Sequence, residues 1–416
     1  MSDRRMMTLT KLFLVIVLLL IRQSRFVSSN WLYLAVTGFS PPWGSHRSHQ
    51  LYYQNPSIER YCSSLNFLNE NQRKTCSSFP YAMLSVSYGA RDSIVECQSQ
   101  FRYERWNCTT KKTENDTIYD IFGSTLNAAN REAAYLQAIT SAGLVYWITK
   151  SCSHGNLTDC SCDATKQGEG RLTTAAAAAM NVVDSTKSLN KEQQNIMDQK
   201  NNINNNNKVQ QHKFLWGGCS DNVKYGVKFS RDFLDKHERQ MFSNDKQIKR
   251  LMAMHNYEVG REAVAHPNRQ RQVCRCHGVS SSCEFRTCWL QMPKMSEVGE
   301  YLKTLYERSS VQVAKRTKKR LRRKEKSERK IRIRHNELVY LFRSPNYCLP
   351  QPESGVYGTT GRECNRTSYG PDGCDMLCCG RGYDTRVVVK TERCQCKFVW
   401  CCYVKCRNCT SEVDVS

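Results

Sequence analysis

The chain has 416 residues, of which 62 are Lys or Arg, 38 are Asp or Glu and 23 are Cys, giving a net charge of +24. A positive charge this high favours binding to nucleic acid if the protein is intracellular, and to anionic glycans or membrane surfaces if it is extracellular. Cysteines this numerous indicate disulfides in a secreted protein and metal or catalytic sites in a cytosolic one. The cellular compartment therefore decides between these classes.

Residues 1–29 have the pattern of a secretory signal peptide. Two arginines precede an apolar stretch at residues 12–21, and Val27 and Ser29 supply small residues before Asn30. The apolar stretch is well short of the ~20 residues that span a bilayer, which disfavours the alternative of a signal anchor. We expect the mature chain to begin near Asn30, to contain no transmembrane segment and to be secreted into the extracellular space and matrix.

Five Asn-x-Thr sequons fit this compartment, and we expect glycosylation at Asn107, Asn115, Asn156, Asn365 and Asn408. Cysteines oxidise there, which disfavours zinc binding by the Cys-x-Cys pairs, and these also differ from the usual C-x2-C zinc spacing. Haem attachment needs Cys-x-x-Cys-His, which the cysteine before His277 does not provide. We expect disulfides, no metal and no cofactor, and the odd number of cysteines leaves at least one thiol without an intrachain partner.

Apolar periodicity predicts a helical N-terminal part. Residues recurring at steps of four and three place one apolar stripe on a helix face. Residues 133–149 are expected to form a buried helix, and further helices are expected from about residue 221 and around residues 255–265. The stripe consists of Phe122, Leu126, Ala129, Ala133 and Leu136.

The C-terminal part is dense in cysteine and has a strand-like composition. Residues 385–390 and 396–404 are rich in valine and aromatic residues, which predicts two strands of a long hairpin. Disulfides would substitute for the core that a segment of about 70 residues cannot build. Residues 163–213, with an alanine run and NNINNNN, predict a disordered insertion.

A basic segment separates the two cysteine-rich halves. Residues 315–334 hold 13 Lys or Arg against two Glu, which is +11 of the whole charge. We expect residues 308–337 to form a basic linker that binds anionic glycans or membrane surfaces, with a merely solvated linker as the alternative. The sequence RLRR at 320–323 also fits a convertase site, with cleavage after Arg323. The expected glycan contacts are Lys318, Lys319, Arg320, Arg322, Arg323 and Lys324.

The most informative motif is CRCHGVSSSCEFRTCW at residues 274–289, in which four cysteines bracket a short polar loop. This spacing predicts nested disulfides that hold Ser280, Ser281 and Ser282 at a tip. A hydrolase is disfavoured because the nucleophile elbow G-x-S-x-G needs a second glycine and a strand-to-helix turn. We therefore expect no enzyme activity.

Together with this motif, six others make the chain resemble the Wnt family of secreted, lipid-modified signalling glycoproteins over most of its mature length. The segments NWLYLAV at 30 and GCSDN at 218 resemble the number-four Wnt subgroup. The six further motifs are CQSQFRYERWNC at 97, NREAAYLQAITSAG at 130, WGGCSDNVKYGVKFSRDF at 216, HNYEVGREAV at 255, GCDMLCCGRGY at 373 and CQCKFVWCCYVKC at 394.

The resemblance implies an α+β, disulfide-rich fold in two parts. A helical N-terminal domain, residues 30–307, would bear a lipidated hairpin thumb, and a cystine-rich C-terminal domain, residues 338–416, would end in a finger hairpin. The two would grip the cysteine-rich domain of a Frizzled receptor. Ser280 would carry a mono-unsaturated acyl chain, and the finger would contact the receptor through Phe398, Trp400, Cys401, Cys402 and Val404.

The resemblance also implies partners. These are a membrane-bound O-acyltransferase and a Wntless-type carrier during secretion, then a low-density-lipoprotein-receptor-related co-receptor and heparan sulfate proteoglycans, with no nucleic acid. The alternative is an unlipidated, cystine-rich growth factor or antagonist that binds glycans. Ser281 stands where the family usually has glycine, and Ser280 is favoured over Ser282 as the acylated residue.

Family pairing implies most of the disulfides, leaving Cys62 and Cys76 as an N-terminal pair and Cys378 as the odd thiol. The implied pairs are Cys97 with Cys108, Cys152 with Cys160, Cys162 with Cys219, Cys274 with Cys288, Cys276 with Cys283, Cys348 with Cys379, Cys364 with Cys374, Cys394 with Cys409, Cys396 with Cys406, and the neighbours Cys401 with Cys402.

Overall fold

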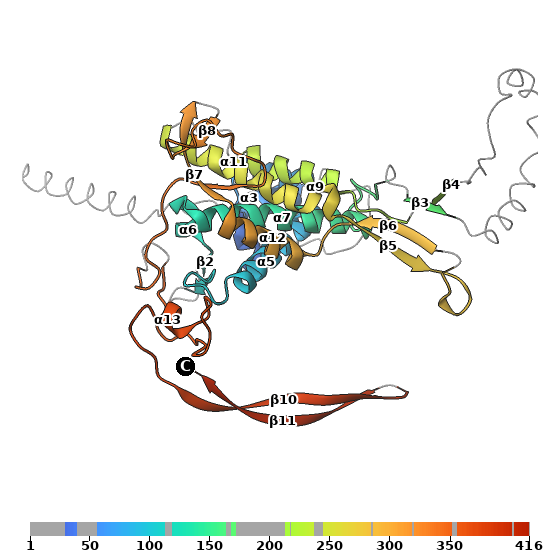
Figure 1. The fold of residues 1–416 in the computed structure, drawn as a ribbon. Helices are drawn as coiled ribbons and strands as arrows, with labels where there is room; N and C mark the ends of the chain where they lie inside the picture. Colours follow the sequence, from blue (N-terminus) through green and yellow to red (C-terminus); the bar gives the residue numbers. More distant parts are fainter. Residues whose placement is uncertain are drawn as a thin grey trace, which may run out of the picture.

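The computed structural model describes residues 30–39, 56–112, 119–163, 168–171, 213–216, 218–236, 244–283, 286–317, 320–351, 356–401 and 403–415. The expected signal peptide and most of the 163–213 insertion lie outside these residues. The described parts combine helices, small sheets and many disulfides, so the predicted α+β, disulfide-rich class is confirmed (Figure 1). Among the described residues, no helix has both the length and the apolar character needed to cross a bilayer.

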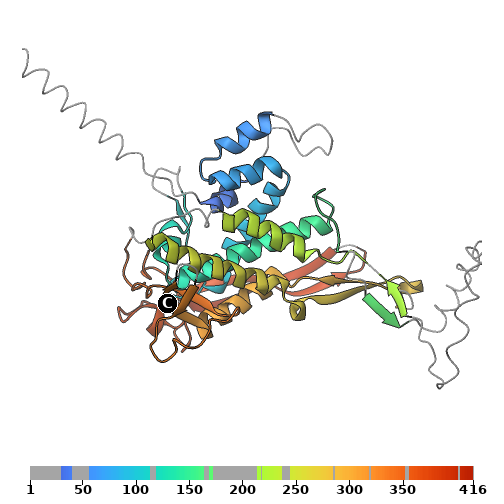
Figure 2. The same cartoon turned by 90° about the horizontal axis from the view of Figure 1, so that it is seen from above.

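Most helices form one body, here called the helical body, and the central helix is α7 (Figures 1 and 2). The helices are η1 (Trp31–Tyr33), α2 (Leu34–Thr37), α3 (Pro56–Ser64), α4 (Glu70–Ser78), α5 (Ala82–Gln100), α6 (Gly123–Ala128), α7 (Arg131–Ser153), α9 (Val223–Ser230), η2 (Arg231–Asp235), α11 (Asn244–Ala265), η3 (Pro267–Arg269), η4 (Val279–Ser281), α12 (Met295–Arg308) and α13 (Cys374–Leu377).

Small residues allow the helices to approach α7 closely. A Cβ atom on Gly143 of α7 would lie 2.1 Å from the Ser93 hydroxyl of α5. On the other side, a Cβ atom on Gly260 of α11 would lie 1.9 Å from the carbonyl oxygen of Ala138. Any larger side chain at either glycine would therefore push a neighbouring helix off the core.

The predicted apolar stripe is buried or partly buried as expected, but it belongs to two helices rather than one. Ala129 is left-handed, with φ of 52°, and it ends α6. Asn130 then caps α7 by accepting a hydrogen bond from the Ala133 amide. An asparagine cap satisfies a backbone amide that a continuous helix would pair internally, so a new helix begins at this point.

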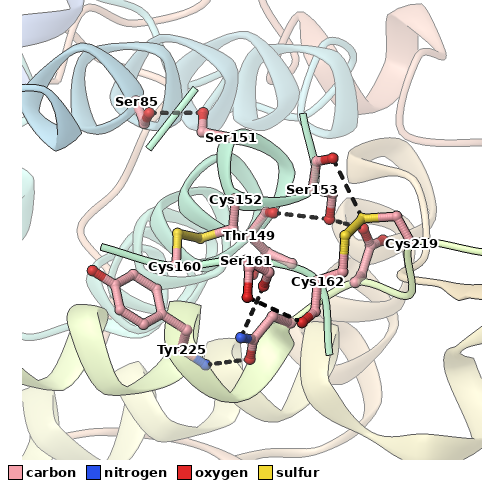
Figure 3. Close-up of a disulfide and its surroundings, with 12 residues drawn as sticks. Ser85, Thr149, Ser151, Cys152, Ser153, Cys160, Ser161, Cys162, Cys219 and Tyr225 are labelled. Carbon is pink, nitrogen blue, oxygen red and sulfur yellow. Dashed lines mark hydrogen bonds between the residues drawn. A yellow bond between two sulfur atoms is a disulfide. The ribbon is translucent and has the colours of Figure 1, made fainter. Parts of the chain in front are cut away.

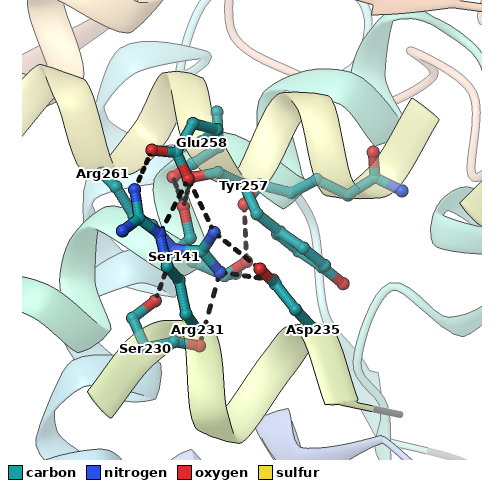
Figure 4. Close-up of polar contacts among 10 residues, drawn as sticks. Ser141, Ser230, Arg231, Asp235, Tyr257, Glu258 and Arg261 are labelled. Carbon is teal, nitrogen blue, oxygen red and sulfur yellow. Dashed lines mark hydrogen bonds and ion pairs between the residues drawn. The ribbon is translucent and has the colours of Figure 1, made fainter. Parts of the chain in front are cut away.

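A buried ion-pair network fixes α11 against η2 (Figure 4). Arg261 is 1% exposed, and its Nη2 lies 2.6 Å from Asp235 Oδ1. Its Nη1 also lies 3.0 Å from Glu258, which in turn pairs with Arg231. Removal of one partner would leave an uncompensated buried charge, which costs several kcal/mol.

The strands form small sheets. In the described residues, β1 (Lys111–Lys112) pairs with β2 (Tyr119–Asp120), and β3 (Gly168–Arg171) pairs with β4 (Lys213–Trp216). The ends of the expected disordered insertion therefore form a short antiparallel ladder. The remaining strands are β5 (Arg271–Cys276), β6 (Arg286–Gln291), β7 (Ser310–Thr317), β8 (Arg320–Arg323), β9 (Leu338–Tyr340), β10 (Arg386–Val399) and β11 (Tyr403–Val415).

The segment 308–337, expected to be a linker, is instead part of the body. Strand β7 pairs antiparallel with β8 and parallel with β9 in a three-stranded sheet. Val313, Leu338 and Val339 are each at most 2% exposed and belong to the main hydrophobic core. Because burial of these side chains holds the sheet against the helices, the boundary of the C-terminal part lies beyond β9 rather than at residue 338.

The C-terminal part has almost no core. After residue 342, the side chains described as buried are those of Val356, Thr359, Cys374 and Leu377. Its contact with the helical body includes Arg362, which donates hydrogen bonds to the carbonyl oxygens of Arg105 and Arg102. Disulfides therefore hold this part together, as expected from its composition.

The finger hairpin consists of β10 and β11, and Trp400 and Cys401 lie in the turn that follows β10. The two segments predicted as opposite strands, 385–390 and 396–404, do not face each other. Residues 386–399 form one strand, and the second predicted segment spans the turn. The valine and aromatic residues of that segment gave no signal for the turn, which places Cys401 at a φ of 84°.

Candidate functional site

The thumb is the hairpin of β5 and β6, residues 271–291, which projects from one end of the helical body (Figures 1 and 2). Cys274 lies directly opposite Cys288 in the ladder, and a disulfide joins them. A second disulfide joins Cys276 to Cys283. The structure thus brings the four cysteines of the motif together as nested pairs around the serine loop.

The thumb tip is a tight polar turn. The Gly278 amide donates to the Ser282 carbonyl at 2.9 Å, and the Ser282 amide donates to the Val279 carbonyl at 3.0 Å. Ser280 is exposed and has φ 54° and ψ 36°, in the left-handed region. Ser281 is not among the positive-φ residues, so the missing glycine does not place the backbone strain at 281. The left-handed residue is Ser280 itself.

The base of the thumb is fixed by the segment around Cys219. The Gly218 and Asp221 amides donate to the carbonyls of Cys288 and Leu290, both at 2.9 Å. The Met292 amide in turn donates to the Asp221 carboxylate at 2.9 Å. These contacts attach β6, one side of the thumb base, to the segment at 218–221, and β5 is held through its ladder with β6.

Two disulfides attach that segment to the end of α7 (Figure 3). Cys152 pairs with Cys160, and Cys162 pairs with Cys219 across 57 residues of sequence. Ser153 at the end of α7 donates a hydrogen bond to Asp221, the residue that also holds Met292. The orientation of the thumb therefore depends on α7 through covalent and hydrogen-bonded links.

The finger projects to the same side of the molecule as the thumb (Figures 1 and 2). Disulfides join Cys394 to Cys409 and Cys396 to Cys406 below its tip. Trp400 is 89% exposed, and no side chain described from residue 381 to the end of the chain is buried. The tip is therefore a patch of large apolar side chains in water, which marks an interaction surface.

Four of the five finger residues expected to bind the receptor, Phe398, Trp400, Cys401 and Val404, are brought together at this tip. Phe398 is 70% exposed and lies opposite Val404, which is 58% exposed. Cys401 is exposed next to them, whereas Cys402 lies outside the described residues, so the expected pair of neighbouring cysteines is not described. Sequence reasoning missed Tyr403, which is 60% exposed at the same turn. The apolar composition of this tip segment was its only signal.

The expected glycan contacts are not equivalent. Lys318 and Lys319 lie outside the described residues, and Arg320 and Lys324 are exposed. Arg323 differs, since it is 8% exposed and its Nη2 lies 2.6 Å from Glu337. A second carboxylate, Glu328, lies 3.2 Å from its Nη1. Because it is buried and paired with two carboxylates, the Arg323 side chain is not free to bind a glycan or the protease that would cleave after it.

The sequons differ in access. Asn156, Asn365 and Asn408 are exposed, Asn107 is partly buried, and Asn115 lies outside the described residues. Asn408 is on β11 of the finger, opposite Arg393. The exposed positions leave room for a glycan.

Ten disulfides join the described cysteines, and they include the expected Cys62–Cys76 pair and every expected pair except Cys401 with Cys402. Cys378 has no disulfide among the described residues, and its Sγ lies 3.6 Å from Cys364 Sγ. Cys364 is bonded to Cys374, so this group of three sulfurs retains a single thiol. One thiol is too few ligands for a zinc site.

Comparisons with known proteins agree on one family. The model of the Wnt family matches residues 64–416. Protein Wnt-16 of Mus musculus is 41% identical over 389 residues, which cover 93% of this chain and 91% of that protein. Protein Wnt-5b of Xenopus laevis is 38% identical over 356 residues, which cover 85% of each. The number-four subgroup is not tested by these matches and stays a prediction.

Two solved structures are also similar. The structure described as human WLS in complex with WNT8A matches with 31% identity and a TM-score of 0.49, covering 80% of this chain and 92% of that chain. The crystal structure of the Drosophila WntD N-terminal domain-linker matches with 18% identity and a TM-score of 0.35, covering 64% of this chain and 97% of that chain.

Proposed function

Because the chain belongs to the Wnt family, we propose that it is a secreted, lipid-modified ligand that grips the cysteine-rich domain of a Frizzled receptor between thumb and finger. Members of this family are secreted signalling ligands and not enzymes. The proposal adds the lipid, the receptor and the residues that contact it.

The observation that carries the proposal is the geometry of the thumb. A rigidly based, doubly disulfide-bonded hairpin presents the Ser280 hydroxyl at its exposed tip. Among the described residues of that tip, the large apolar side chain that is exposed is Val279, at 87%. A tip this polar supplies little apolar area, whereas an acyl chain contributes about 0.8 kcal/mol for each methylene buried. A lipid on Ser280 would therefore provide much of the affinity for an apolar receptor groove.

The finger would make the second contact with the receptor domain. Its exposed aromatic and aliphatic side chains, Phe398, Trp400 and Val404, bring apolar area without a lipid. Aromatic residues that fill pockets often dominate binding energy at interfaces. We expect Cys401 and Cys402 to contribute to the same contact.

The lipid also explains the partners proposed for secretion. An acyl chain in water favours membranes or carriers, so a membrane-bound O-acyltransferase would attach it and a Wntless-type carrier would shield it. Outside the cell, a single chain gives only reversible membrane binding. Heparan sulfate proteoglycans would add an electrostatic hold, and a low-density-lipoprotein-receptor-related co-receptor would complete the receptor complex.

The proposal is tested by tandem mass spectrometry of secreted protein after reduction, alkylation and trypsin digestion. The peptide CHGVSSSCEFR, residues 276–286, should carry an ester-linked unsaturated acyl group on Ser280. Ser280→Ala should abolish the modification and the entry of the protein into a detergent phase, whereas Ser282→Ala should leave both unchanged. An unmodified wild-type peptide would refute lipidation and favour the unlipidated, glycan-binding alternative.

A further inference from the structure

The basic run of the sequence is divided by the fold into two environments. On one side of β8, Arg323 faces Glu328 and Glu337, which neutralise it. On the other side lies a second pocket of about 450 Å³ between β8, α11 and the loop at 329–333, and Arg329 lines both this pocket and the cavity around Arg323. This cavity, here called the basic pocket, is lined by Leu251, His255, Arg320, Leu321, Arg322, Arg329, Lys330, Ile331, Arg332 and Ile333.

The basic pocket is unusual in its charge. Five Lys or Arg side chains line it and no carboxylate does, and none of the five forms an ion pair with any described residue. Arg322 adds a second observation, because its Nε is buried and has no hydrogen-bond partner in the described part of the chain. That buried atom is out of reach of a ligand, so an oxyanion in the pocket would be held by the other guanidinium nitrogens of Arg322 and by the other four cations.

We propose that the basic pocket binds a sulfated segment of a glycan chain. Arginine guanidinium groups donate paired hydrogen bonds to planar or tetrahedral oxyanions, and four of the five cations are arginines. The aliphatic wall, which includes Leu321 and Ile333, offers a surface for the carbon faces of sugar rings. The volume lies in the range that encloses small ligands.

The shape of the pocket favours a glycan over a membrane. A bilayer surface engages apolar side chains that protrude. Of the four apolar side chains that line this hollow, Ile331 is exposed, whereas Leu251, Leu321 and Ile333 are partly buried. A linear polyanion can lower one segment into such a hollow while the rest of the chain stays in water. The inference rests on the glycan binding in the proposed function. It places the glycan in the basic pocket, which does not include Arg323 or Lys324, rather than along the whole basic run.

The test compares two charge-matched variants of the full-length secreted protein. Arg322→Gln with Arg332→Gln removes two cations from the pocket, and Lys324→Gln with Lys326→Gln removes two exposed cations outside it. The probe is a heparin octasaccharide at about 0.15 M ionic strength, where distant exposed charges are largely screened. The pocket variant should bind at least about tenfold more weakly, and the control should change less than about twofold.

Equal weakening of octasaccharide binding in the two variants would contradict a specific pocket and indicate diffuse electrostatic attraction to the basic surface. The same variants are added to vesicles of phosphatidylcholine and phosphatidylserine, and a pocket variant that loses vesicle binding but keeps the octasaccharide would assign the site to lipid instead. Binding to the Frizzled cysteine-rich domain should stay unchanged in both variants. If wild-type protein fails to bind that domain while octasaccharide binding still depends on the pocket, the receptor proposal fails and this inference stands.

Discussion

Thumb and finger are both two-stranded antiparallel hairpins with two disulfides, yet they are supported in different ways. The base of the thumb is hydrogen-bonded to the segment at 218–221, and Cys288 in it is fully buried. No side chain whose burial is described in the finger is buried, and the finger rises from a part with almost no core. A hairpin attached to a body can present a polar tip, whereas an isolated one relies on its cross-links.

The tips differ in the opposite sense. The finger exposes Phe398, Trp400, Tyr403 and Val404, while the thumb exposes Ser280 and Val279. The well-supported hairpin thus carries the polar tip, and the weakly supported hairpin carries the apolar one. If the thumb acquires its apolar area as a lipid, this difference is explained, because the chemistry is added after folding.

The largest effect that tests the comparison is removal of matched disulfides. Cys394→Ser with Cys409→Ser removes the outer bridge of the finger, which spans 15 residues of sequence, and Cys274→Ser with Cys288→Ser removes that of the thumb, which spans 14. Because the inner bridge stays closed in each hairpin, the lost chain constraint is at most about 3 kcal/mol in each case. Amide hydrogen exchange should show lost protection along the whole finger, whereas the thumb base stays protected by its contacts with the body. Equal loss in both hairpins would contradict the difference in support.

A smaller effect is expected from the tips. Trp400→Ala in acylated protein should weaken binding to the Frizzled cysteine-rich domain by about 2 kcal/mol, or roughly thirtyfold, as for an aromatic residue at an interface centre. Val279→Ala should cost much less, since the lipid dominates the thumb contact. Titration of the receptor domain by biolayer interferometry measures both. Val388→Ala, lower on the finger, is the control for a general effect on the hairpin. An equal loss of affinity for Val279→Ala and Trp400→Ala would contradict the proposal that the lipid dominates the thumb contact.

The smallest effect concerns pH. Desolvation of partly buried His255 lowers its pKa from 6.5, while its Nε2 donates a hydrogen bond to the Glu337 carbonyl. Folding therefore favours the neutral form of His255. The resulting stabilisation of the folded protein is complete above pH 6.5, and it is lost as the pH falls from there to the lower pKa of the folded state.

The helical body should accordingly lose up to about 1 kcal/mol between pH 7 and pH 5.5, measured by urea denaturation monitored at the helical circular-dichroism band. His255→Gln should reduce this slope. The finger contains no histidine, so its hydrogen exchange, corrected for the intrinsic pH dependence, should not follow the same change. If His255→Gln leaves the pH dependence of the unfolding free energy unchanged, a group other than His255 causes it.

Much of the architecture was visible in local sequence. Apolar spacing located α7, α9 and α11, because a helix face repeats within a few residues and needs no knowledge of distant contacts. The spacing of cysteines around Ser280 indicated a nested tip for the same reason. The errors arose where periodicity continued through a break, as at Ala129, or where strand-forming residues occupied a turn, as at Trp400.

The sequence by itself determined the family, the fold class and the two hairpins, because motifs, cysteine spacing and short-range periodicity are local properties. Only the tertiary structure decided how the basic segment is used. Charge alone made all its residues look equivalent, yet Glu337, brought close through the packing of β9 beside β7, neutralises Arg323. The same packing leaves Arg322 facing a pocket without a carboxylate. A contact between distant segments therefore assigns neighbouring arginines to opposite roles.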